Sequence, residues 1–514
     1  TNKKWLTFMQ QAYIMMTAQQ VEMLWAEARS CGRAFSMKRG MVMEECYMVR
    51  EEKKVHVEND LGKDDIRQLV RRIALPSMLA QFVSVLYSIV DRMYIGHIPG
   101  FGELALAGVG VCGPVVTMIG SVASLVGMGG APLMSIRMGE GNKTEARNIL
   151  ANCFFMLCLF SAVLMALVIP LRTPMLLFFG ASEATLPYAD TYFFYYLLGT
   201  PFALLATGMN SFVVAQGFAK KAMTSVVLGA VMNIVLDPIL IFAFNMGVQG
   251  AAIATVLSQI ASCAYVLAFL FGRRVPIPIA LKGYSLRIAG RVLGVGLTPF
   301  SIIAVDNVMI IALNAVLQRY GGPEEGDLLI TVATIVQSFM LVVTMPLGGI
   351  SGGTQPILSF NFGARQAERV MRAQRRIFLW CLSYTSGMFV LAWIASPLFV
   401  RLFTTDAVVA EKAVWAIHAC TLALIPLGIQ YEIVDGFTAI GLVRFSWPLS
   451  FWRKAVYFAA LFLLPSWFGA EAVFYAEAVS DVIGPLVSIG VHALVMKRYL
   501  ALRAAPLENG SLLP

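Results

Sequence analysis

Two polar side chains in an otherwise apolar stretch, residues 226–242, have the types and the spacing to hold a small cation. Asn233 and Asp237 are four residues apart, which puts both on one face of a helix. Pro238 follows directly and has no backbone N–H, so a carbonyl one turn earlier loses its helical partner. Carboxylate, amide and carbonyl oxygens suit Na⁺, and a carboxylate can also hold a proton. The alternative is that the pair only makes a polar contact between packed helices.

Asp91 is a further carboxylate in an apolar stretch. Inside a bilayer such a group is expensive unless it is paired, hydrated or protonated, so it points to a functional site. Tyr87 and Ser88 precede it by one helical turn on the same face. Arg92 is adjacent, and the alternative is an ion pair at the membrane surface. Thr255, in another apolar stretch, could add a hydroxyl oxygen or be a small packing residue.

More acids lie in apolar stretches of the second half of the chain: Asp306, Glu432, Asp435, Glu477 and Asp481. The second and third of these are three residues apart and the last two are four apart, so each pair shares a helix face. Neighbouring carboxylates repel each other, and such a pair attracts a proton or a cation. We keep Asp306, Glu432, Asp435 and Asp481 as secondary candidates. For Asp481, a hydrogen bond to a neighbouring helix is an equal alternative.

The composition explains why these acids are informative. The chain is 58% hydrophobic and only 13% charged, against about 25% charged in ordinary soluble domains. A helix that crosses a bilayer needs about 20 apolar residues, and the sequence divides into twelve such stretches. They lie near 73–97, 104–135, 148–171, 188–216, 222–244, 248–271, 288–317, 328–358, 376–399, 408–440, 446–467 and 472–496. The sequence therefore predicts an all-α polytopic membrane protein with twelve transmembrane helices.

The two halves of the chain repeat each other. Residues 132–139 (PLMSIRMG) match 356–363 (PILSFNFG), a shift of 356 minus 132, or 224 residues, and a similar shift relates Pro76 to Pro299. Because each half has an even number of spans, the two lobes should be related by a pseudo-twofold axis along the membrane normal. Such a duplication is typical of secondary transporters, in which two lobes rock about a central site. Pro76, Pro238 and Pro299 are the predicted kinks.

Loop charges predict the orientation. The loops at 137–147, 220–221, 273–287 and 365–376 are rich in Lys and Arg, whereas the opposite loops are short and mostly acidic. By the positive-inside rule both termini are cytoplasmic, and the net charge of +9 is mainly a topology signal. A nucleic-acid role would need a basic face on a soluble domain. We find no signal peptide before the first span, so that span itself should direct insertion.

These spans and loops divide the chain into four parts. We expect an N-terminal extension of unassigned role at 1–60, a first lobe at 61–280 and a second lobe at 281–498. A cytoplasmic tail follows at 499–514.

The polar and aromatic residues of the spans indicate the cargo. Basic residues are scarce in the middle of the predicted spans, whereas carboxylates, Met and aromatic residues recur there. Carboxylates attract positive charge, aromatic rings add cation–π attraction and Met adapts to many shapes. The sequence therefore predicts small lipophilic cations as cargo. We place Tyr87, Asn210, Met232 and Gln337 in the substrate cavity, with Asn210 matching Asp435 in the repeat.

Other classes of protein fit the sequence less well. No nucleophile–base pair, phosphate-binding loop or Cys/His metal spacing appears, so we expect no enzyme, no cofactor and no metal beyond Na⁺. A lipid-linked saccharide flippase is an alternative, but it should carry more spans and a basic cluster in its cavity. A membrane receptor or scaffold is a non-transport alternative. We predict membrane lipid as the surroundings and no obligate protein partner.

Several motifs together resemble one transporter family. Residues 76–91 followed by 94–96 (YIG) resemble the first span of the multidrug and toxic compound extrusion (MATE) transporters. Residues 139–142 (GEGN) and 361–364 (NFGA) are similar to that family's repeated loop signature, and 233–238 is similar to the span-five motif of its bacterial DinF-like branch. The resemblance covers about 70–500 and is in register across both halves.

The resemblance implies a V-shaped, two-lobed bundle in the bacterial plasma membrane that exports organic cations in exchange for H⁺ or Na⁺. In the DinF-like branch, the coupling ion binds in the first lobe, and the matching residues here are Asp91, Asn233, Asp237 and Thr255. In the NorM-like branch the emphasis is on acids of spans seven and ten, where Asp306 and either Glu432 or Asp435 fall at similar places. The lobe that holds the coupling site is therefore left open at this point.

Overall fold

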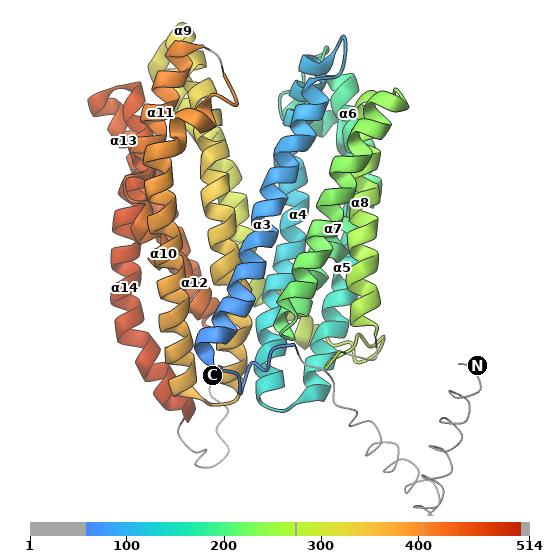
Figure 1. The fold of residues 1–514 in the computed structure, drawn as a ribbon, viewed down its shortest axis with the longest axis vertical. Helices are drawn as coiled ribbons and strands as arrows, with labels where there is room; N and C mark the ends of the chain where they lie inside the picture. Colours follow the sequence, from blue (N-terminus) through green and yellow to red (C-terminus); the bar gives the residue numbers. More distant parts are fainter. Residues whose placement is uncertain (1–57, 273–274, 405, 505–514) are drawn as a thin grey trace, which may run out of the picture. The chain divides into compact units, whose positions relative to one another are not determined.

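The computed structural model of the protein describes residues 58–272, 275–404 and 406–504, which are mostly helical (Figure 1). The predicted extension at 1–60, except its last three residues, and the tail beyond residue 504 lie outside the described residues. The first half contains α3 (Ile66–Gly96), α4 (Gly102–Gly139), α5 (Lys143–Phe178), α6 (Leu186–Ala215), α7 (Ala219–Pro238), the π-helical turn η1 (Ile239–Ala243) and α8 (Gly247–Leu270). The second half contains α9 (Leu286–Gly363), α10 (Ala367–Val400), α11 (Ala407–Thr421), α12 (Leu424–Ala439), α13 (Val443–Phe468), the 3₁₀ turn η2 (Ala470–Phe474) and α14 (Tyr475–Ala504).

Most of these helices are suited to a membrane. Ten helices or helix segments among the described residues are long and apolar enough to cross one, and α11 with α12, bent by 49°, forms a further span. α13 is not among them, because Arg453 and Lys454 lower its hydropathy. The predicted all-α membrane architecture is confirmed. The tenth predicted span differs from expectation in being a broken helix.

α9 joins two predicted spans in one run of 78 residues. The break lies at Gly322, whose φ of 70° is one that glycine adopts without strain. We call Leu286–Gly322 and Leu328–Gly363 the first and second segments of α9. Pro299 lies inside the first segment, as Pro76 lies inside α3, so each of these helices lacks one backbone hydrogen bond in its interior.

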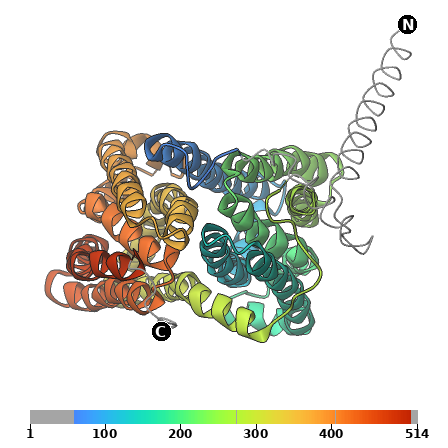
Figure 2. The same ribbon diagram turned by 90° about the horizontal axis from the view of Figure 1, so that it is seen from below.

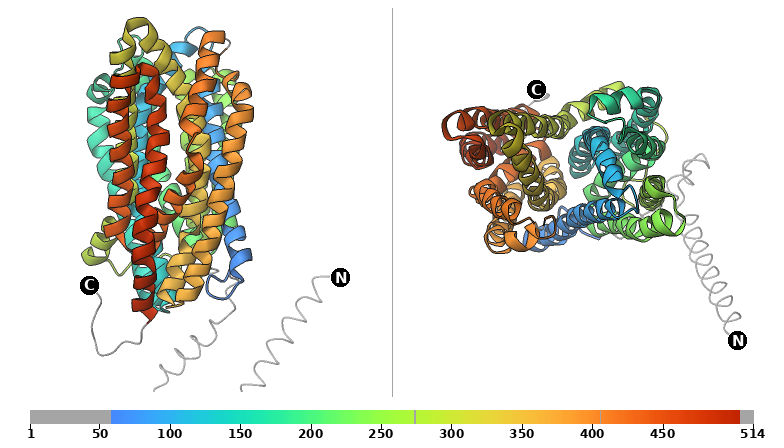
Figure 3. Two further views of the ribbon diagram at one scale, coloured as in Figure 1. Left: turned by 90° about the vertical axis from the view of Figure 1, so that its left-hand side faces the viewer. Right: turned by 90° about the horizontal axis from the view of Figure 1, so that it is seen from above.

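The described helices form two groups, α3–α8 and α9–α14, each with its own apolar core (Figures 2 and 3). The starts of α3, α7 and α9 cross this division, with Ala219 of α7 buried in the core of the second group. Leu69 and Ile73 of α3 are buried in the core of the second group, and Val292 of α9 is buried in the core of the first. In Figure 2, α3 and the first segment of α9 lie on opposite sides of the junction between the groups. The start of α3, the first helix of the first group, therefore packs in the second group, and the start of α9, the first helix of the second group, packs in the first.

The two groups are in close backbone contact where α4 and the second segment of α9 end. A Cβ atom on Gly139 would collide with the carbonyl oxygen of Phe360, and one on Gly363 would collide with that of Ile136. These two contacts are related by the 224-residue repeat, so they lie on its pseudo-twofold axis. Only glycine allows backbones to approach this closely. We call this end of the bundle, marked by Gly139 and Gly363, the closed end.

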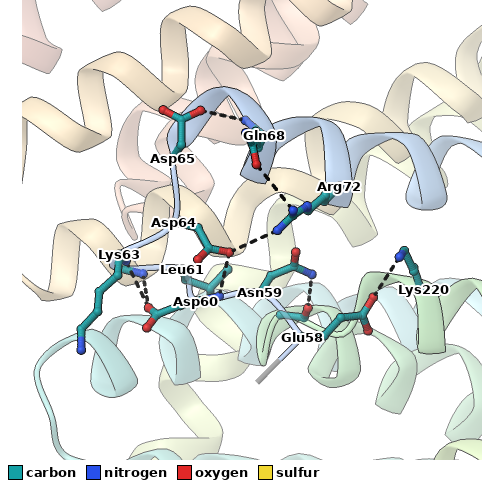
Figure 4. Close-up of polar contacts among 12 residues, drawn as sticks. Glu58, Asn59, Asp60, Leu61, Lys63, Asp64, Asp65, Gln68, Arg72 and Lys220 are labelled. Carbon is teal, nitrogen blue, oxygen red and sulfur yellow. Dashed lines mark hydrogen bonds and ion pairs between the residues drawn. The ribbon is translucent and has the colours of Figure 1, made fainter. Parts of the chain in front are cut away.

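A short segment before α3, residues 58–65, connects both groups at the closed end (Figure 4). The amide Nδ2 of Asn59 donates to the carbonyl of Gly217, between α6 and α7, at 2.7 Å. The carbonyl of Leu61 accepts from Asn361 at 2.9 Å, and that of Asp64 accepts from Arg369 at 3.0 Å. We call residues 58–65 the lead-in segment. It holds the first group through Gly217 and the second group through Asn361 and Arg369.

Replacing Arg369 by Ala should favour separation of the two groups at the closed end. The change removes three hydrogen bonds, two to the lead-in segment and one to Asn361, and each such bond is worth about 1 kcal/mol. Spin labels at the exposed positions Lys143 and Gln366 should report a larger fraction of long distances.

The matched control is Arg372→Ala, one turn further along α10. Arg372 is 60% exposed and its nearest carboxylate partner, Glu368, is 3.7 Å away. This control should leave the distance distribution unchanged. An equal response of the two variants would contradict a clamping role for the lead-in segment.

Candidate ion site and central cavity

Three helices bring the first-half candidates together. Asn233 of α7 donates its Nδ2 to Asp237 Oδ1 at 3.2 Å and to Thr255 Oγ1 of α8 at 3.4 Å. The carboxyl groups of Asp237 and Asp91, the latter from α3, are direct neighbours. Asp237 is fully buried and Asp91 is 9% exposed. We call these four residues the ion site.

The local fold of α7 suits this arrangement. α7 ends at Pro238 and continues into the π-helical turn η1, so the regular hydrogen-bond ladder changes directly after Asp237. Such π-helical turns occur frequently at functional sites. Asn233 and Asp237 do share one face, as their spacing predicts. Arg92, the alternative partner of Asp91, is exposed on the outside of α3, whereas Asp91 is buried toward α7.

The ion site contains oxygen atoms that lack partners. Asp91 Oδ1, Asn233 Oδ1 and Asp237 Oδ2 are all buried and accept no hydrogen bond within the described part of the chain. An unsatisfied buried polar atom is costly, and more so next to a second carboxyl group. The donor set consists of carboxyl, amide and hydroxyl oxygens, which fits Na⁺ or a proton shared by the two acids.

Gln259 and two tyrosines were not foreseen from the sequence. Gln259 lies one turn after Thr255 on α8, and its buried Oε1 also lacks a partner. Its side chain interacts with Tyr196 of α6, while Tyr192 lies near Asp91. The four-residue spacing from Thr255 was the available signal for Gln259, but the sequence could not show that α6 supplies the aromatic neighbours.

Replacing Gln259 by Leu should weaken ion binding about fivefold, because one neutral hydrogen-bonding group is worth about 1 kcal/mol. The measurement is the ion-dependent shift of the thermal midpoint in detergent, titrated with Na⁺ and with pH. Gln249→Leu, on the same helix, removes the bond to Tyr195 at 2.7 Å outside the ion site. That control should bind the ion as the wild type does, and equal weakening in both variants would speak against a role for Gln259.

A cavity of about 440 Å³ lies next to the ion site and is called the central cavity. Its walls come from α3, α4, α6, α7, α8 and the second segment of α9. Tyr87, Asn233 and Thr255 contribute to its lining, so the ion site opens onto it. Its lining reaches Pro132 and Pro356, which are seven residues, or about 10 Å of helix, from the glycines of the closed end.

The predicted substrate residues divide into two pairs. Tyr87 and Asn210 line the central cavity, whereas Met232 and Gln337 do not. Met232 precedes Asn233 by one residue and therefore points about 100° away around α7. Gln337 lies eleven residues, or about 16 Å along α9, from Gly348, the nearest lining residue of that helix. Another methionine of α7, Met223, lines the cavity instead.

The second-half acids have partners that the sequence analysis overlooked. Lys454 of α13 forms an ion pair with Asp306 in the first segment of α9. Arg453, also of α13, lies 2.5 Å from Asp481 and 3.3 Å from Glu477, both on α14. Both bases are buried, so the expectation that bases are scarce inside the spans is wrong for α13. Each base is retained there because an acid of a neighbouring helix compensates its charge.

The remaining acids, both on α12, have neutral partners. Asp435 accepts a hydrogen bond from Gln355 Nε2 at 3.0 Å. Glu432 is 2% exposed and lies beside Gln374 of α10. Neither acid lines the central cavity. Asp306 and Asp481 thus belong to one charged group around Arg453 and Lys454, whereas Glu432 and Asp435 neighbour each other on α12.

The fold and the site define a duplicated helical membrane transporter, and sequence comparison places it in a family. A MatE family profile matches residues 76–239 and 303–451, more than half of the chain. The multidrug export protein MepA of Staphylococcus aureus is 22% identical over 448 residues, which cover 85% of this chain and 95% of MepA. An FAD transporter of Shewanella oneidensis is 26% identical over 385 residues, 71% of this chain and 80% of that protein. A solved MATE family multidrug resistance transporter in an outward-facing conformation aligns with a TM-score of 0.79 at 22% identity, covering 86% of this chain and 98% of that one.

The chain belongs to the MatE family of multidrug efflux transporters. It is thus a transporter of the membrane and not an enzyme.

Proposed function

We propose that the protein is a secondary antiporter that exports drug-sized organic molecules in exchange for H⁺ or Na⁺. One observation carries this proposal: a buried pair of acids with unsatisfied oxygens opens, through Asn233 and Thr255, onto a cavity large enough for a drug. The presence of all four ion-site residues also supports placement in the DinF-like branch. The secondary acids are less suited to coupling, because Asp306 and Asp481 already pair with bases.

The proposed location is the bacterial plasma membrane, with both termini in the cytoplasm. The basic loops at 137–147 and 365–376 flank the closed end, which would then face the cytoplasm. The conformation described above would accordingly be closed to the cytoplasm. Ion binding would neutralise the acid pair and repack α3 around Pro76, and cargo and ion would each lower the affinity for the other. An ion gradient supplies about 2.3 kcal/mol per charge for each 100 mV.

A flippase for lipid-linked saccharides is the second candidate. It would need free positive charge to hold a pyrophosphate. Arg453 and Lys454 are the bases available inside α13, and acids on α14 and α9 already pair with them. The geometry therefore favours the antiporter.

The test is transport in proteoliposomes with H⁺ and Na⁺ gradients imposed separately. Uphill movement of a fluorescent substrate under one gradient, absent from protein-free liposomes, is the expected result and names the ion. The sequence predicts organic cations as the cargo, and ethidium is the probe for that class. No substrate movement under either gradient, in protein shown to be folded, would contradict the antiporter.

A further inference from the structure

The lining of the central cavity is unusual for a transporter of cations, because none of its residues is charged. Its polar members are all neutral: Ser77, Gln81, Ser84, Tyr87, Ser124, Tyr196, Thr207, Asn210, Ser211, Ser225, Asn233, Thr255, Ser258, Gln259, Ser262 and Gln355. Most of the other lining residues are small, so the cavity is roomy and uncharged, with neutral polar groups set in a mainly apolar surface. The carboxylates that led the sequence analysis to predict a cationic cargo do not form its wall.

The nearby acids do not line the central cavity. Asp237 is fully buried and Asp91 is nearly so, with Asn233 and Thr255 forming the cavity wall beside them. Asp435 lies on the other side, where Gln355 donates to it from the cavity wall. A drug-sized cation in the cavity therefore has no lining carboxylate to contact, although the half-buried Asp435 lies close behind Gly352. Such a cation would leave water without gaining a contacting counter-charge, which is unfavourable.

Neutral hydrogen-bonding groups face the cavity from several helices. Ser77 and Gln81 lie one turn apart on α3, and Gln259 and Asn210 face the cavity from α8 and α6. Asn210 accepts from Ser225 Oγ at 3.1 Å, which aligns its amide. Cargo can hydrogen-bond to the partly exposed neutral side chains of this lining, such as Gln81 and Asn210.

The wall contributed by α9 is flat. Gly348 and Gly352 line the cavity, and a Cβ atom on either would lie no closer than 3.6 Å to any neighbouring side chain. The neighbouring lining residues Gly349 and Gly353, by contrast, pack tightly against Ser77 of α3. The open surface at Gly348 and Gly352, bordered by hydrogen-bonding side chains of α3, suits the face of a planar ring system. The volume of about 440 Å³ lies in the range for drug-sized ligands.

We infer that the preferred cargo is a drug-sized molecule without net charge, built on a flat ring system with several hydrogen-bond donors and acceptors at its rim. This inference rests on the proposed function and narrows its cargo class. Hydrogen bonds and apolar contact select the cargo, while the acids behind the wall bind only the small coupling ion. Ion binding therefore lowers the affinity for cargo by changing the shape of the cavity. Cargo and ion do not bind to the same carboxylate.

The test compares two fluorescent probes with the same three-ring frame, uncharged acridone and the permanent cation 10-methylacridinium. Binding to the purified wild-type protein is measured by fluorescence titration. We expect acridone to bind at least about tenfold more tightly. Gln81→Glu places a carboxylate on the cavity wall and should strengthen 10-methylacridinium binding about tenfold. Gln68→Glu makes the same change at an exposed position of α3 outside the cavity and should leave both affinities unchanged.

The inference would be overturned if the wild type bound 10-methylacridinium more tightly than acridone. It would also be overturned if Gln81→Glu and Gln68→Glu had the same ratio of affinities for the two probes. Gln81→Leu guards against misfolding of the charged variant, because it should bind acridone about fivefold more weakly and leave the cation unaffected. Ion binding is measured in the same samples as the Na⁺- or pH-dependent thermal shift. If that shift is absent, the proposed ion coupling fails; if it is present and the cation is preferred, only the cargo inference fails.

Discussion

Replacing Asp237 by Asn should abolish ion-coupled transport while the protein still folds and inserts. The amide has nearly the shape of the carboxyl group, and its oxygen can still accept from Asn233 Nδ2. The charge that attracts the ion to the pair with Asp91 is lost, however. Loss of one partner from a buried charge contact costs about 3 kcal/mol, so ion affinity should fall roughly 100-fold.

Gradient-driven transport in proteoliposomes measures the effect, and the ion-dependent thermal shift should disappear in parallel. Asp190→Asn is the matched control, because Asp190 lies in the same helical group but bonds to Arg172 at 2.9 Å outside the central cavity. This control should transport at the wild-type rate. Full coupled transport by Asp237→Asn would remove Asp237 from the ion site and direct attention to Glu432 and Asp435.

The second large effect should come from Arg453→Met, as a loss of stability. Asp481 is fully buried and 2.5 Å from the Arg453 guanidinium. Removing the base leaves a buried acid without its counter-charge, which costs about 3–5 kcal/mol. We expect a clear drop in the thermal midpoint in detergent. The double variant Arg453→Met with Asp481→Leu should regain most of the loss, since an apolar pair of similar volume often replaces a buried ion pair.

The control for this effect is Lys412→Met. Lys412 also contacts two acids, Glu471 at 2.5 Å and Glu325 at 3.7 Å, but both acids are well exposed. Solvent screens this pair, and its loss should cost less than about 1 kcal/mol. A double variant as unstable as Arg453→Met alone would show that the charge pair is not the cause, and that the shape of Arg453 in its packing site matters instead.

Local patterns in the sequence predicted a large part of the fold and one face of the ion site. The apolar runs predicted the membrane helices because a bilayer enforces length and hydrophobicity on each span separately. The spacing of Asn233 and Asp237 predicted their shared face because it depends only on the helix period. The motif that ends at residues 139 and 363 showed the repeat. In the structure, Gly139 contacts the backbone at Phe360, and its repeat counterpart Gly363 contacts the backbone at Ile136.

Other features could not be read from local patterns. The sequence shows that Arg453 and Lys454 lie in an apolar stretch, but their acidic partners are 24 or more residues away in the chain. Met232 and Gln337 have residue types suited to a cavity, yet neither lies on the helix face that lines it. The rotation of a helix against its neighbours depends on packing over its whole length, which no single motif encodes.

The sequence alone determined the class of protein, the number of its repeats and the residues able to hold a small cation, because these follow from composition and helix periodicity. Only the tertiary structure decided which charges face each other and which face the cargo. It paired Asp306 and Asp481 with bases, joined Asp91 to Asp237, and left the central cavity without a charged side chain. The physical reason is that the free energy of a charge in a membrane protein is set by neighbours brought together from distant helices.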